Sequence, residues 1–189
     1  MKERGKRMTH TKNKKLSYPE KEAYFYIRQQ FAAQGVTIRE MAKEAKLDQD
    51  EHHVKASLET YIKAIQNQLH KHDVMSIIMT GLAIDRLAEK DMLPSPLQTI
   101  IQNDLGLYST DELLSIALTQ MYSGIAVTNY GARDVKKKKL AKRIDESKAH
   151  VNCFLDDIIS AIIAGAEAAV ANKLQENKAS FTDIDKKFE

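Results

Sequence analysis

The segment that most restricts how this chain can fold is CFLDDIISAIIAGAEAAVA, residues 153–171, which is apolar or small on almost every side. On a helical wheel its large apolar residues fill one broad face, and alanine and glycine cover the opposite face. A helix without a polar face has to be surrounded by its neighbours. The sequence therefore predicts a buried central helix over about 150–173, with the rest of the chain packed around it.

Two adjacent carboxylates, Asp156 and Asp157, stand near the start of this segment, and Glu167 is its only other charged residue. An isolated ionised carboxylate is costly to remove from water. The wheel places Asp157 on the small-residue side and Asp156 at the edge of the apolar face. Carboxylates held there need a cation, a hydrogen-bond network or protonation. The alternative interpretation is that both are solvent-exposed residues at the helix start.

Composition favours helices in the rest of the chain as well. Only 7 Gly and 3 Pro occur among 189 residues, and Ala, Leu, Ile, Lys and Glu are abundant. No run of residues alternates between apolar and polar as a strand would. The predicted fold class is all-α, a multihelical bundle with a central buried helix surrounded by others. Besides the central helix, the spacing of apolar residues predicts helices over 19–34, 37–47, 51–71, 73–90, 97–105 and 109–127.

Local signals mark some of the predicted ends. Thr37 with Glu40 has the spacing of a capping box, and so does Ser109 with Glu112. The segment TNYGARD, residues 128–134, is expected to be irregular, and the run of lysines that follows it is expected to be polar surface. Capping is also the plain structural explanation for Glu112.

Basic side chains gather at the N-terminus, where residues 1–15 hold seven of them and one acid, while the whole chain has a net charge of +3. The composition predicts a flexible basic arm over 1–16, a single helical domain over 17–175 and a polar tail over 176–189. Such an arm can contact an anionic membrane, although a solvated tail is equally compatible with its composition.

The sequence also favours a cytoplasmic protein. Its single cysteine, Cys153, has no partner for an internal disulfide and is most simply a core residue. The N-terminus lacks an apolar signal-peptide core. Charged residues interrupt the apolar stretches 73–90 and 153–171, so no membrane-spanning helix is expected. Peripheral contact with the inner face of the membrane through the basic arm is compatible with these features.

Acidic residues outside the central helix suggest a metal site. Together with Asp156 and Asp157, three residues form the candidate set: Asp111, Glu112 and Asp134. Oxygen-only ligands from several helices suit Mg²⁺, which keeps waters that a phosphate can displace. The basic run 136–139, with Arg133 close before it, offers cations for a phosphate. The alternative for that run is a solvated face.

Other chemistries find little support. The histidines and Cys153 have no metal-binding spacing, and no nucleophilic triad or glycine-rich phosphate loop is present. The stretch GVTIREMAKEAKLDQD, residues 35–50, is similar to the first helix of a helix-turn-helix. However, its would-be recognition segment is acidic and would repel DNA phosphates. We therefore expect no nucleic-acid partner, and keep nucleic-acid binding only as a lesser alternative.

Four short blocks occur in a recognisable order: TGLAIDRLAE (80–89), GLYSTDELLS (106–115), TNYGARDVKK (128–137) and FLDDIISAIIAG (154–165). With these blocks, the chain from about Asp73 to Lys173 resembles the phosphatidylglycerophosphatase A family, in its soluble low-temperature-requirement-C-like branch. The resemblance implies Mg²⁺-dependent removal of the terminal phosphate of phosphatidylglycerophosphate, which yields phosphatidylglycerol.

The resemblance also implies roles for individual residues. The family's two acidic blocks fall on Asp111–Glu112 and Asp156–Asp157, which are expected to bind the metal or its waters. Asp134 and Lys137 match a third block, in which Arg133 replaces an aromatic residue and Lys138 a proline. Asp134 is then expected to orient water or metal, and Lys137, with Arg133, to stabilise charge on the phosphate. Asn129 is expected to fix a ligand.

Two departures from the family widen the range of functions. The family's Gly/Thr/Pro-rich N-terminal motif and the spanning helices of its membrane enzymes are missing from this sequence. The substrate is accordingly a phosphorylated small molecule or a lipid headgroup. The alternative function is that of a non-catalytic metal-binding or scaffold protein. A helical bundle with exposed apolar faces often self-associates, so a homo-oligomer is expected.

Overall fold

The computed structural model describes residues 17–106 and 108–176, and in these residues all regular structure is helical. This confirms the predicted all-α class. Along the chain the helices are α1 (Glu20–Ala33), α2 (Ile38–Glu51), α3 (Leu58–Leu69), α4 (His72–Glu89), α5 (Leu97–Gln102), α6 (Thr110–Gln120), α7 (Gly124–Val135), α8 (Lys139–Asp145) and α9 (Leu155–Glu176). None of these helices is long and apolar enough to cross a membrane.

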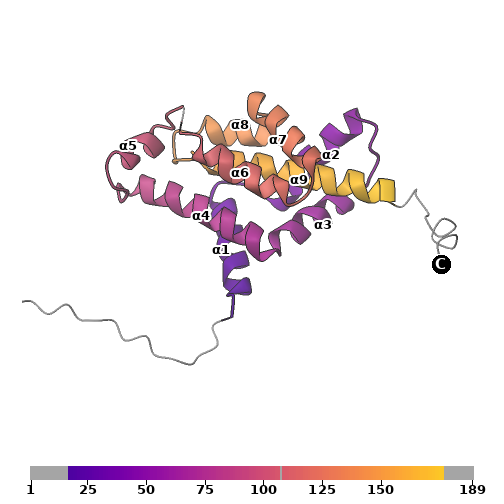
Figure 1. The fold of residues 1–189 in the computed structure, drawn as a ribbon, viewed down its shortest axis with the longest axis horizontal. Helices are drawn as coiled ribbons and strands as arrows, with labels where there is room; N and C mark the ends of the chain where they lie inside the picture. Colours follow the sequence, from indigo (N-terminus) through magenta and orange to yellow (C-terminus); the bar gives the residue numbers. More distant parts are fainter. Residues whose placement is uncertain (1–16, 107, 177–189) are drawn as a thin grey trace, which may run out of the picture.

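Helix α9 forms the centre of the bundle, as predicted (Figure 1). It packs against α2, α3, α4, α6, α7 and α8, whereas α1 packs on α4 at the edge of the molecule. Every residue from 152 to 168 is buried, Cys153 and Glu167 among them. Because α9 has no exposed face over this length, its three carboxylates have to find their partners inside the protein.

A glycine in α4 allows that helix to cross the start of α9 closely. A Cβ atom at Gly81 would lie 2.7 Å from Cδ1 of Ile158 and 3.0 Å from Cβ of Phe154. Neither neighbour can move freely, because both Ile158 and Phe154 are fully buried. The absence of a side chain at Gly81 therefore determines how closely α4 approaches the start of α9.

We expect Gly81→Ala to lower the free energy of unfolding by about 1–3 kcal/mol, because the added methyl group overpacks a filled core. The matched control is Gly131→Ala in α7, where a Cβ would meet no atom within 4 Å. That variant should be more stable than the wild type by up to about 1 kcal/mol, through helix propensity alone. Urea denaturation of both proteins measures the difference, and equal shifts in the two variants would contradict the close crossing.

Of the two capping boxes predicted from the sequence, one is present in the structure and one is not. The capping box of Thr37 and Glu40 is present, so that prediction is confirmed. The box predicted for Ser109 and Glu112 is wrong: Ser109 has a left-handed backbone with φ of 55° and its side chain caps nothing. Glu112 therefore has no capping role, and its carboxylate is available to the candidate site.

The segment TNYGARD is helical, which corrects the prediction that it is irregular. The chain breaks earlier, at 121–123, where the side chain of Ser123 accepts a hydrogen bond from Ala126 N–H and starts α7. Burial of Ala126, Tyr130 and Arg133 at helical spacing outweighs the low helix propensity of the asparagine and glycine in this segment.

The predicted boundary between the second and third helices is also wrong. Helix α2 continues to Glu51, and α3 begins only at Leu58, capped by Ser57. The polar end of α2 stays helical because the buried Glu44 and Asp48 both accept hydrogen bonds from Arg133 of α7. The predicted basic arm, and the predicted tail beyond Glu176, lie outside the described residues.

Candidate metal centre at the start of helix α9

A carboxylate from α4 positions the start of α9. Phe154 N–H donates to both oxygens of Asp85, at 3.1 and 3.2 Å, and Leu155 N–H donates to Oδ2 at 3.1 Å. Asp85 is buried, and burial raises its pKa well above the ordinary value although both hydrogen bonds lower it. Asp85 was not predicted to be a site residue. The signal was an aspartate inside the apolar stretch 73–90, the same kind of signal that drew attention to Asp156 and Asp157.

Three carboxylates converge beside this helix start, and we call them the acidic cluster: Asp111, Glu112 and Asp157. Asp111 and Glu112 come from the first turn of α6, and Asp157 comes from the first turn of α9. One oxygen from each lies within 4.8 Å of the others. Asp111 and Asp157 are buried, and Glu112 is half-buried. These are three of the residues that the sequence singled out as metal ligands.

Hydrogen bonds within the described residues leave part of the acidic cluster unsatisfied. Among the described residues, Oδ1 of Asp111, Oε2 of Glu112 and Oδ1 of Asp157 are buried without a hydrogen-bond partner. Burial, and then repulsion from Asp156, raises the pKa of Asp157 to about 9. The pKa of Glu112 is also raised, by the adjacent Asp111 carboxyl group and by burial. Oxygen atoms that are buried, close together and unsatisfied fit a hard divalent cation such as Mg²⁺.

The other oxygen of Asp111 is already occupied. Cys153 Sγ donates to Asp111 Oδ2 at 3.4 Å, and both residues are buried. Burial raises the pKa of the Cys153 thiol, so the sulfur remains a neutral donor. This agrees with the prediction that Cys153 is a core residue. The contact leaves Oδ1 of Asp111 without a hydrogen-bond partner among the described residues.

Asp156 is paired with a lysine and is not one of the converging carboxylates. It accepts a hydrogen bond from Lys137 Nζ, which also donates to Asp145 at 2.9 Å. Burial raises the pKa of Asp156 to about 7, although Lys137 opposes the shift. Burial also lowers the pKa of Lys137, but its two carboxylate partners outweigh this effect and the pKa is raised. The ammonium group therefore stays charged beside the acidic cluster.

Asp134 lies near the acidic cluster on its α7 side. Burial raises its pKa, Lys137 lowers it, Glu112 raises it, and the neighbouring Asp157 side chain lowers it. Its half-buried position leaves it in partial contact with solvent. The structure thus brings Asp134 and Lys137 to the same place as the three converging carboxylates, as the sequence predicted.

Arg133 and Asn129 do not join this group. The Arg133 guanidinium donates to Glu44 at 2.8 Å, to Asp48, and to Glu167 at 3.1 and 3.2 Å. We call these four residues the Arg133 network. Asn129 Nδ2 donates to the second oxygen of Glu167 at 2.8 Å. Arg133 was expected at a phosphate and Asn129 at a ligand, whereas the structure places both in a buried ion-pair network between α2, α7 and α9.

The Arg133 network is deeply buried, and its charged groups change one another's pKa values. Arg133 is only 3% exposed, and Glu167 also 3%. Burial lowers the pKa of Arg133, but the carboxylates of Glu167, Glu44 and Asp48 outweigh it and the pKa is raised. Burial raises the pKa of Glu167 to about 7, with Arg133 opposing the shift. Glu167, the third charge of the central helix, is thereby explained by an ion pair within the fold.

The fold agrees with the comparison against known proteins. Residues 54–172 match the sequence profile of the family described as phosphatidylglycerophosphatase A, and the chain belongs to that family. Within it, the chain is similar to the low temperature requirement C protein of Listeria monocytogenes. The crystal structure of that protein superposes with a TM-score of 0.78 at 32% identity, over 82% of this chain and 99% of the other.

Two further relatives come from Bacillus subtilis (strain 168). The uncharacterized protein YpjQ is 33% identical over 142 residues, which are 75% of this chain and 80% of the relative. Its crystal structure superposes with a TM-score of 0.79 at 31% identity, over 84% of this chain and 99% of the other. The uncharacterized protein YutG is 33% identical over 145 residues, which are 76% of this chain and 87% of the relative. The resemblance read from the four sequence blocks is thereby confirmed.

Proposed function

We propose that the protein is a Mg²⁺-dependent phosphomonoester hydrolase that converts phosphatidylglycerophosphate to phosphatidylglycerol. The observation that supports this most directly is the acidic cluster, with three buried or half-buried carboxylates from two helices, each with an oxygen that has no partner among the described residues. Membership of the phosphatidylglycerophosphatase A family supports the reaction class. In this proposal Asp111, Glu112 and Asp157 hold the cation.

The bound cation would supply positive charge for the phosphate oxygens and lower the pKa of a water molecule. The protein's own groups supply the rest. Lys137, fixed by Asp156 and Asp145, offers an ammonium group that offsets negative charge on the phosphate. Asp134, half-buried beside Asp157, is placed to accept a proton from the attacking water. Water oxygen bonds to phosphorus, the ester P–O bond breaks, the leaving glycerol oxygen takes a proton from solvent, and Asp134 releases its proton to solvent.

The surroundings of the site support a lipid substrate over a soluble one. Leu113 follows Glu112 on α6 and is 62% exposed, and Val135 follows Asp134 on α7 and is 82% exposed. Large apolar side chains exposed next to a polar site are typical of contact with an apolar partner. In this proposal they contact the membrane that contains the substrate, and the basic residues of 1–16 add attraction to anionic lipid. We also propose that the protein self-associates through exposed apolar side chains.

Phosphate release from phosphatidylglycerophosphate in phosphatidylglycerol-free vesicles tests the proposal. We expect release with Mg²⁺, none after a chelator is added, and recovery when excess Mg²⁺ is returned. Hydrolysis of a soluble phosphomonoester such as glycerol 3-phosphate, without hydrolysis of the lipid, would refute the lipid substrate and retain the reaction class. Mg²⁺ binding without hydrolysis of either ester would refute the enzyme and favour a non-catalytic metal-binding protein.

A further inference from the structure

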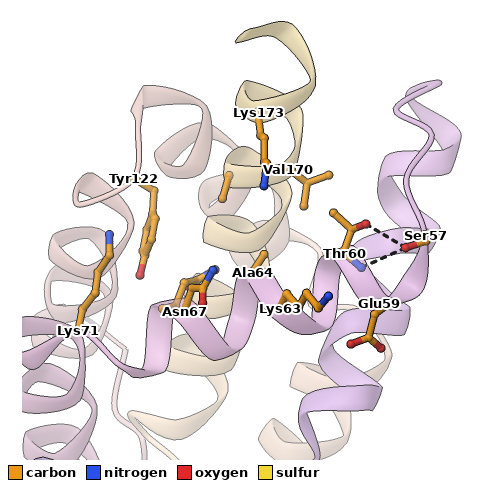
Figure 2. A pocket seen from close by; sticks show the side chains of 12 residues that line it. Ser57, Glu59, Thr60, Lys63, Ala64, Asn67, Lys71, Tyr122, Val170 and Lys173 are labelled. Carbon is orange, nitrogen blue, oxygen red and sulfur yellow. Dashed lines mark hydrogen bonds between the residues drawn. The ribbon is translucent and has the colours of Figure 1, made fainter. Parts of the chain in front are cut away.

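A second concave site lies between α3, the C-terminal half of α9 and the turn that joins α6 to α7 (Figure 2). Its volume is about 460 Å³, within the range of small-molecule pockets. No residue of the acidic cluster lines it. Val170, in its wall, follows Asp157 by 13 positions on α9, which corresponds to about 20 Å along the helix axis. The pocket is therefore separate from the proposed catalytic site.

An unsatisfied amide lines this pocket. Gln68 of α3 is 1% exposed, and among the described residues neither its Nε2 nor its Oε1 has a hydrogen-bond partner. A buried amide without partners costs about 1–3 kcal/mol, so folding alone gives no reason to keep it. Gly165 of α9 makes room for it, since a Cβ there would lie 2.9 Å from Gln68 Oε1 and 2.9 Å from Tyr122 Cδ2. The pocket wall thus contains an adjacent donor and acceptor that have no partner among the described residues.

Positive charge surrounds the same pocket. Lys63 and Lys71 line it from α3 and the residue pair that follows α3, and Lys173 lines it from α9. Figure 2 shows the Lys173 side chain directed from α9 toward α3, and Lys71 beside the ring of Tyr122, with its Nζ 4.6 Å from the ring centroid. Within the described part of the chain, none of these lysines forms an ion pair with a carboxylate within 4.0 Å.

The charge of the pocket matches a phosphate monoester. Three lysines and one acid in the lining, Glu59, sum to about two positive charges. A phosphate monoester has about −1.5 to −2 charges at pH 7. The lysine ammonium groups are flexible point charges suited to phosphate, while the Gln68 amide is suited to an edge with a donor beside an acceptor, as on a nucleobase.

We propose that this pocket binds a nucleoside monophosphate, with the phosphate held by Lys63, Lys71 and Lys173 and the base edge paired with the Gln68 amide. A membrane surface fits the observations less well. Anionic lipid can neutralise the exposed lysines, but a flat surface does not reach an amide that is 1% exposed. Ordered water can pair with Gln68, but it leaves the three lysines without an anion.

The test measures binding of AMP, GMP, CMP and UMP to the wild-type protein by calorimetry, without Mg²⁺, so that the acidic cluster has no part in the result. We expect at least one of them to bind and to raise the midpoint of thermal unfolding. Ribose 5-phosphate, which has the phosphate without the base, should bind at least roughly tenfold more weakly. Failure of all four nucleotides to bind would overturn the proposal.

Variants distinguish nucleotide binding in this pocket from unspecific binding and from loss of folding. Gln68→Met replaces the unsatisfied amide by an apolar side chain of similar length, so it should raise stability and weaken nucleotide binding by roughly tenfold. Lys63→Ala combined with Lys173→Ala should weaken binding at least as much, whereas Lys148→Ala, an exposed lysine elsewhere, should not change it. Nucleotide binding that is unchanged in Gln68→Met would overturn the assignment. So would binding of anionic vesicles, but of no nucleotide, that is lost in the double lysine variant.

Discussion

We expect Asp157→Asn to reduce the proposed Mg²⁺-dependent phosphate release by roughly a hundred- to a thousandfold, while the protein remains folded. The size of the effect is that of removing one electrostatic group from a preorganised active site. Asparagine keeps the shape of the side chain but removes a negative charge from the acidic cluster, and the amide is a poorer partner for a divalent cation. Phosphate release at saturating Mg²⁺ and isothermal titration with Mg²⁺ measure the two effects.

The thermal stability of Asp157→Asn shows whether Asp157 has a functional or a structural role. Its carboxylate is buried, Oδ1 has no partner among the described residues, and burial raises its pKa. The neutral amide therefore removes a cost from the metal-free protein, and thermal unfolding of Asp157→Asn should occur at the wild-type temperature or above it. Asp50→Asn, an exposed carboxylate paired with Lys46, is the matched control and should leave release within about twofold. Full activity in Asp157→Asn would remove this residue from the proposed mechanism.

We expect Arg133→Met to lower the free energy of unfolding by about 3–5 kcal/mol, because it leaves the carboxylates of Glu44, Asp48 and Glu167 buried without their shared cation. Methionine preserves much of the buried volume, so the loss reports mainly on charge. Urea denaturation at pH 7 measures it. If Arg133 served only the phosphate, the same variant would lose activity at wild-type stability, and that result would contradict the placement of Arg133 in the fold.

Two further variants test this explanation of the Arg133 effect. Lys138→Ala removes an exposed lysine that contacts Asp48 at 2.9 Å, and it should cost less than about 1 kcal/mol because solvent screens that pair. Adding Glu167→Gln to Arg133→Met should recover part of the lost stability, since one of the unpaired charges is then absent. A double variant that is less stable than Arg133→Met would show that Glu167 does not depend on the guanidinium.

Most residues of the candidate site could be predicted from the sequence because the patterns that reveal them are local. Asp156 and Asp157 are conspicuous within an apolar segment, and the burial of both confirms that they need partners inside the protein. Asp111, Glu112 and Asp134 were singled out with them and lie in the same region of the structure. Asp85 was missed, although it gives the same signal, because the sequence did not show that two backbone N–H groups would face it.

Local sequence patterns do not determine which partner each of two adjacent side chains will meet. Arg133 and Asp134 are adjacent on α7, yet successive side chains of a helix differ in direction by about 100°. Arg133 therefore reaches α2 and Glu167, while Asp134 faces Asp157. Asp156 and Asp157 diverge in the same way, toward Lys137 and toward the acidic cluster. Which member of each pair serves the site depends on where the neighbouring helices cross.

The sequence by itself determined that the chain is helical, that the segment after residue 153 is its central helix, and that this helix buries carboxylates. These follow from composition and periodicity, which act within a few turns of one helix. Only the tertiary structure decided that Asp157 joins Asp111 and Glu112, that Asp156 pairs with Lys137, and that Glu167 pairs with Arg133. Such partners are far apart in the chain, and the approach of one helix to another, as at Gly81, sets which of them meet.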